Sequence, residues 1–92
     1  MDTIVAVYEA NEKVCETFDA YSDAEEALVK AMDDGANHWT MKGLKLERKV
    51  AKLNAVAAER AYDLALYNLE SKHGKGAVRR VRDDINGLVE II

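Results

Sequence analysis

TIVAVY, residues 3–8, decides the fold class expected for this chain, because its β-branched and aromatic side chains are typical of a β-strand. Polar residues suited to a turn follow at residues 10–13, and VCETF at residues 14–18 has the character of a return strand. We therefore predict a β-hairpin over residues 1–21. Since a hairpin alone is barely stable in water, one of its faces must pack on the rest of the chain. The predicted fold class is α+β, with this hairpin packed on three helices.

The first of these helices is predicted over residues 22–35. Ser22 and Glu25 have the spacing of a capping box, in which each side chain satisfies a backbone amide at the start of a helix. Gly35 can take the left-handed conformation that ends a helix. Apolar side chains between these two signals recur at the spacing of one helical face: Ala24, Ala27, Leu28, Ala31 and Met32.

A long helix over residues 44–72 and a C-terminal helix over residues 77–91 are predicted to form an antiparallel pair. Residues 38–43 could form a short third strand or a loop. The long helix has an apolar seam with alternating spacings of four and three, interrupted by Arg60. The seam consists of Leu46, Val50, Leu53, Ala57, Leu64 and Tyr67. A second apolar face widens beyond Ala57, so this helix needs two partners. At roughly 43 Å it would also exceed a compact domain of this size, and should kink, break or project into another subunit.

Length and composition indicate one ordered domain spanning residues 1–92. Apolar residues make up 49% of the chain, but fourteen of them are alanines, which bury little surface, so a second subunit would add stability. The net charge of −4 is unevenly distributed, with −8 over residues 1–36 and +4 over residues 37–92. Such asymmetry can steer a partner or draw the two halves of the chain together.

The sequence also indicates where the chain resides. No segment approaches the roughly 20 apolar residues that a membrane-spanning helix needs. The chain opens Met1-Asp2-Thr3 without a basic segment, so we expect no signal peptide. The single cysteine, Cys15, cannot form an internal disulfide and indicates a reducing compartment. The expected localisation is therefore cytoplasmic, with no membrane partner.

Residues able to carry catalysis or to bind a metal are few, and their spacing follows no known pattern. Cys15, His38 and His73 are not joined by a CxxC, HxxxH or HExxH spacing. Adjacent carboxylates such as Asp83 and Asp84 point about 100° apart on a helix and do not converge on a shared proton. We therefore expect no enzyme, no catalytic residue, no metal site and no cofactor.

Two charged surfaces are candidates for binding another molecule. The first is the acidic N-terminal half, whose carboxylates can occupy a basic, nucleic-acid-binding groove on another protein or simply keep the chain soluble. Its candidate residues are Glu12, Glu16, Asp19, Asp23, Glu26, Asp33 and Asp34. Trp39, the one tryptophan, is either a core residue or an anchor of this interface.

The second candidate surface is a basic loop and the helix that follows it. Glycines that open a helix leave amides able to bind an anion, and nearby cations strengthen the field. The candidates for contact with a phosphate or a nucleic-acid backbone are Lys72, Lys75, Arg79, Arg80 and Arg82. The arginines can instead pair with Asp83, Asp84 or the acidic half of the chain.

The favoured function is a non-catalytic protein-binding module, a small adaptor or inhibitor, with a homodimer through the long helix as one form of association. In makeup the chain looks like the small acidic proteins that phages encode to block host defence or nucleic-acid enzymes, such as anti-CRISPR and anti-restriction proteins. The resemblance is one of composition and rests on no motif. It implies an acidic surface that blocks a defence or nucleic-acid-processing complex. The alternative is a protein that binds the nucleic-acid backbone through its basic loop and C-terminal helix.

Overall fold

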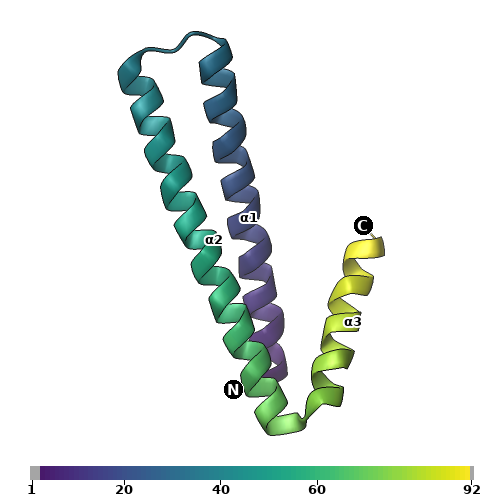
Figure 1. Cartoon of the computed structure of the whole chain (residues 1–92). Helices are drawn as coiled ribbons and strands as arrows, with labels where there is room; N and C mark the ends of the chain where they lie inside the picture. The colour runs from purple at the N-terminus through teal and green to yellow at the C-terminus, as the bar shows by residue number, and fades with distance from the viewer. Residues whose placement is uncertain (1–2, 92) are drawn as a thin grey trace.

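The computed structural model describes the backbone of residues 3–91 and the side chains of residues 3–87. Within this range the chain forms three α-helices and no β-strand. They are α1 (Thr3–Asp33), α2 (His38–His73) and α3 (Lys75–Ile91). α1 and α2 form a long antiparallel hairpin, and α3 turns back at the end of α2 and diverges from the hairpin (Figure 1).

The predicted β-hairpin is wrong, and with it the α+β fold class, because residues 3–21 belong to the single helix α1. A set of its buried and half-buried side chains has the alternating spacing of one helical face. This set is Thr3, Val7, Ala10, Val14, Thr17, Tyr21, Ala24, Leu28 and Ala31. The spacing runs unbroken through both predicted strands, the predicted turn and the predicted helix. Strand propensity differs between residues by only about 1 kcal/mol, so packing one helical face against α2 outweighs it.

The predicted helix start at Ser22 is also wrong, since Ser22 and Glu25 lie in the middle of α1. The predicted stop at Gly35 does end this helix. Gly35 has a φ of +69°, and its N–H donates to the Met32 carbonyl at 3.2 Å. The Ala36 N–H donates to the Ala31 carbonyl at 2.9 Å, which completes the hydrogen-bond pattern of a left-handed helix terminus.

The possible third strand at residues 38–43 is wrong as well, because α2 starts at His38. Asn37 caps this helix through its side-chain oxygen, which accepts a hydrogen bond from the Thr40 N–H at 2.9 Å. α2 ends at Gly74, whose φ is +87° and whose N–H donates to the Glu70 carbonyl at 2.8 Å. Its 36 residues give a length of about 54 Å, so α2 sets the longest dimension of the molecule, 54 Å.

The largest buried side chains gather where all three helices meet. Val7 of α1, Leu66 and Leu69 of α2, and Val81 and Ile85 of α3 form one buried cluster. Elsewhere along the hairpin, Leu28 of α1 and two small residues of α2, Ala55 and Ala58, are buried. The main antiparallel pair is therefore α1 with α2. The predicted pairing of α2 with the C-terminal helix is limited to the end of the hairpin.

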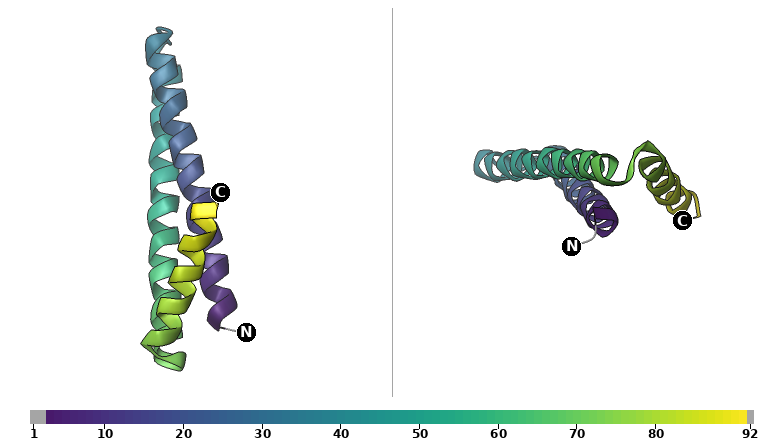
Figure 2. Two further views of the ribbon diagram at one scale, coloured as in Figure 1. Left: turned by 90° about the vertical axis from the view of Figure 1, so that its right-hand side faces the viewer. Right: turned by 90° about the horizontal axis from the view of Figure 1, so that it is seen from below.

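The molecule is elongated, which leaves much of its apolar surface exposed. Its radius of gyration is 17.3 Å, whereas a compact domain of this length would have about 12 Å. The three dimensions are 54, 25 and 18 Å, and two further views show the slender hairpin with α3 beside one end (Figure 2). None of the helices in residues 3–91 combines the length and apolar character needed to cross a membrane.

Candidate functional site

α2 has two apolar faces on opposite sides of the helix. The inner face packs against α1 and, near its end, against α3. Its buried and half-buried members are Met41, Leu44, Ala51, Ala55, Ala58, Tyr62, Ala65, Leu66 and Leu69. Each residue of the seam predicted from the sequence comes two positions after an inner-face position. Since successive residues of a helix are about 100° apart, the seam is rotated by about 200° from the inner face. It therefore lies on the side of α2 opposite the inner face, although Leu46, Val50 and Leu64 also line grooves shared with α1. We call it the outer seam: Leu46, Val50, Leu53, Ala57, Leu64 and Tyr67.

The outer seam faces solvent along its whole length. Leu46, Leu53, Leu64 and Tyr67 are each at least 60% exposed, and Val50 is 49% exposed. A groove of about 500 Å³ between α1 and α2 adjoins it, with Leu46, Val50 and Ala51 among its lining residues. The apolar spacing in the sequence identified this seam, and the structure shows that α1 occupies the other face of the helix. The outer seam is thus an exposed surface with the apolar spacing that packed helices use.

The exposed surface of α1 carries a row of carboxylates, beside apolar side chains such as Phe18, Val29 and Met32. Six of the seven predicted carboxylates recur along α1 with the same alternating spacing as its buried and half-buried side chains. Each comes two residues after one of those positions. They form one exposed row, which we call the acidic stripe: Glu12, Glu16, Asp19, Asp23, Glu26 and Asp33. Asp34 follows directly after the helix and is exposed too. The structure therefore brings the predicted acidic residues together in one exposed row on α1, and Glu16 of this row also lines the groove between α1 and α2.

Trp39 lies in the first turn of α2, at the loop end of the hairpin, and is 74% exposed. The His38 ring meets it edge-on with the centroids 5.3 Å apart, and the Lys42 ammonium lies 5.6 Å from the indole centroid. These neighbours hold the indole at the surface by weak polar contacts. Trp39 is thus not a core residue, and its role as an interface anchor stays a prediction.

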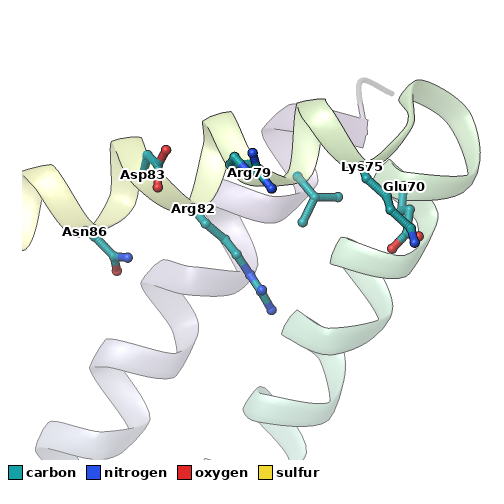
Figure 3. Close-up of a pocket in the computed structure, with 7 residues that line it drawn as sticks. Glu70, Lys75, Arg79, Arg82, Asp83 and Asn86 are labelled. Atoms are coloured by element: carbon teal, nitrogen blue, oxygen red, sulfur yellow. The ribbon is translucent and has the colours of Figure 1, made fainter.

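Three of the predicted anion-binding residues line one groove beside α3. Lys75, Arg79 and Arg82 surround a space of about 370 Å³, together with the carboxylates of Glu70 and Asp83 (Figure 3). Because two carboxylates line this space along with the three basic groups, its field is mixed rather than uniformly positive. A mixed field attracts a phosphate backbone less than a row of cations does.

The two remaining basic candidates lie apart from this groove. Arg80 lines a separate groove of about 440 Å³ with His73 and Gly76. Lys72 belongs to the last turn of α2 and is exposed. The structure therefore divides the predicted basic cluster between two grooves instead of forming one continuous positive surface.

The side chains that could support catalysis are widely separated. His38 and His73 occupy the two ends of α2, about 50 Å apart at 1.5 Å per residue. Cys15 is exposed on α1. Among the described residues, no group of three or more histidine, cysteine or carboxylate side chains is placed to hold a metal ion.

Tyr8 links α1 to α3, a contact that could not be predicted from the sequence. Its hydroxyl donates a hydrogen bond of 2.5 Å to the Asp84 carboxylate. This hydrogen bond raises the pKa of Tyr8, with smaller contributions from partial burial and from the negative charge of Asp84. The bond needs a protonated tyrosine, so deprotonation of Tyr8 removes it.

We expect Tyr8→Phe to loosen α3, seen as faster amide exchange in residues 77–87 and a lower melting temperature. The stabilisation depends on pH with a defined sign. Because the folded pKa lies above the ordinary value of 10.0, the bond contributes fully below pH 10 and is lost as the pH rises through the folded pKa. The melting temperatures of the two proteins should therefore converge as the pH rises above 10. A gap that stays constant over this range would show that the hydrogen bond does not stabilise the fold.

Comparison of this chain with models of known protein families, with curated proteins and with solved structures gives no match. The functional assignment therefore depends on the geometry of the three surfaces described above. Of these, only the outer seam is predominantly apolar, with Arg60 as its one interruption. The acidic stripe has the solvated character of an ordinary helix exterior, and the basic residues are divided.

Proposed function

We propose that this chain is a non-catalytic protein-binding module, a small adaptor or inhibitor, and that another protein docks on the outer seam of α2. The observation that carries the proposal is the exposure of this seam: four of its large side chains are at least 60% exposed. Contiguous exposed apolar surface on a small protein marks an interaction site. The alternating spacing of the seam is the one by which a helix receives another helix, knob into hole.

The rest of the molecule supports this proposal. Its buried cluster is confined to one end, so the hairpin gains stability if a partner covers its exposed apolar face. The acidic stripe and Trp39 are further surfaces that a basic partner could use, in a reducing, cytoplasmic compartment. The steering effect of such a charged surface falls with salt, whereas docking on the apolar seam should not.

Leu53→Asp combined with Leu64→Asp is expected to abolish association while leaving the helices intact. Both leucines are about 60% exposed in the isolated chain, so an aspartate at either position stays hydrated there. In a docked complex each carboxylate would be buried without a partner, which is strongly unfavourable. The measurement combines circular dichroism, light scattering for self-association, and capture of proteins from a lysate.

The matched control is Val29→Asp, which puts the same charge at an exposed apolar position on α1. It should leave association unchanged. The proposal fails if the wild-type chain associates with nothing, itself included, or if the seam variant associates as well as the wild type.

Direct nucleic-acid binding is the alternative function, and the divided basic residues do not favour it. We expect no electrophoretic shift of DNA or RNA at low salt, because the acidic stripe repels the backbone and Arg79 and Arg80 line different grooves. A shift that disappears in the variant Arg79→Glu with Arg80→Glu would replace the proposed function with this alternative.

A further inference from the structure

We infer that the protein docked on the outer seam is a second copy of this chain, lying antiparallel to the first. This inference rests on the proposed function, because it assigns the occupant of the same surface. The charges beside the seam carry it.

One row of exposed residues flanks the outer seam on α2. Lys49, Val56 and Asp63 each come directly before a seam residue, and the row continues at the same heptad spacing in both directions. We call it the flanking row: Lys42, Lys49, Val56, Asp63 and Glu70. The row is basic before Val56 and acidic after it. Its charges therefore change sign about its midpoint.

An antiparallel pair of α2 helices sets this row against itself in reverse. Residues that flank the seam of a helix pair decide its orientation through their charges. With Val56 beside its own copy, Lys49 faces Asp63 of the second copy and Lys42 faces Glu70 of the second copy. The two-fold symmetry repeats both pairs. Each lysine of the row thus meets a carboxylate, and no like charges meet.

A parallel pair would not use the charges in this way. The flanking row would then face the row on the other side of the seam, which consists of Glu47, Asn54, Ala61 and Asn68. Only Lys42 would meet an opposite charge, that of Glu47. The charge pattern therefore favours the antiparallel orientation.

The same alignment also interleaves the seam residues. Leu46 lies level with residue 66 of the second copy, between Leu64 and Tyr67, and Val50 lies level with residue 62, between Arg60 and Leu64. Ala57 lies level with residue 55 of the second copy, between Leu53 and Ala57. Arg60, which interrupts the seam, lies near Leu53 of the second copy, where its aliphatic stem can cover the leucine while its guanidinium reaches water.

Cross-linking of full-length variants tests the orientation. In a Cys15→Ser background, which removes the one native thiol, Val56→Cys should form a disulfide-linked dimer under mild oxidation because the two thiols adjoin. Leu46→Cys should not, since the antiparallel pair puts the two copies of residue 46 at opposite ends of the seam. A parallel pair reverses both results, because it aligns Leu46 with its own copy and separates the flanking rows.

Charge reversal tests the pairing without a new thiol. Lys49→Glu alone and Asp63→Lys alone should each weaken the dimer by about tenfold, measured by analytical ultracentrifugation, because each meets a like charge twice. The two changes together restore opposite charges and should restore the wild-type dissociation constant. Lys30→Glu, an exposed reversal in the last turn of α1, is the control and should leave the constant unchanged.

The inference is supported if the dimer cross-links through residue 56 and if Lys49→Glu with Asp63→Lys restores the wild-type dissociation constant. A dimer that cross-links through residue 46, a higher oligomer, or reversals without effect overturn it. A chain that stays monomeric overturns it as well. The monomer could still bind another protein, and the variant Leu53→Asp with Leu64→Asp could lose this binding. In that case the proposed function survives while this inference fails.

Discussion

Replacing Asn11 by proline is expected to destabilise the protein by about 3 kcal/mol or more. Asn11 lies in the third turn of α1, where a regular helix uses the N–H of each residue to bond the carbonyl four residues earlier. Proline removes this N–H, and its ring clashes with the same carbonyl. Since a small domain is stable by only about 5–15 kcal/mol, the loss would be a large fraction of the whole.

The measurement is chemical denaturation of the wild type, Asn11→Pro and the control Asn11→Ala. The alanine variant removes the same side chain but keeps the helix, so it should stay within about 1 kcal/mol of the wild type. A hairpin with its turn at residues 10–13 would accept proline at this position, because turns favour it there. Equal stability of Asn11→Pro and Asn11→Ala would therefore restore the hairpin and contradict α1.

Local composition explains why the sequence indicated this hairpin. Residues 3–8 and 14–18 are rich in β-branched and aromatic side chains, and a polar segment separates them. The inward face of α1 is filled partly by threonine and alanine, such as Thr3, Ala10 and Thr17, so its helical period is weak in apolar residues. Two features did point to a helix: no glycine or proline precedes Gly35, and the alternating spacing runs without a break.

Other parts of the fold followed from stronger signals. Gly35 ends α1 because only glycine takes a positive φ there without strain. The alternating spacing from Leu46 to Tyr67 belongs to α2 as expected, and the acidic residues form one stripe. The orientation of the two apolar faces of α2 could not be predicted, because it depends on α1 being the neighbour. With the N-terminal segment taken as a hairpin, no long helix was available to cover the inner face.

The candidate site, like the fold, could be predicted only in part from the sequence. Spacing alone identified the outer seam, but its exposure depends on which face α1 covers. The meaning of the flanking row appears only once the seam is known to face solvent, because charges beside a buried seam would face α1 instead. Tyr8 and Asp84 are 76 residues apart in sequence, and only the return of α3 brings them together.

Leu69→Ala is expected to cost about 2–5 kcal/mol and to lower the melting temperature by roughly 8 °C or more. Leu69 is fully buried in the cluster that joins the three helices, so its truncation leaves a cavity that Val7, Val81 and Ile85 cannot fill without moving. The exposed neighbour Asn68→Ala is the control and should change stability by less than about 0.5 kcal/mol.

Leu64→Ala separates packing within one chain from association between chains. Leu64 lies on the same helix as Leu69 but on the outer seam, 60% exposed. In dilute solution its loss should be nearly neutral, because few contacts disappear. Where the chains associate, the same change should lower the melting temperature, since binding stabilises the folded state by mass action. The cost of Leu69→Ala should be large at every concentration. Equal costs for the two leucines in dilute solution would mean that the inner and outer faces of α2 are assigned the wrong way round.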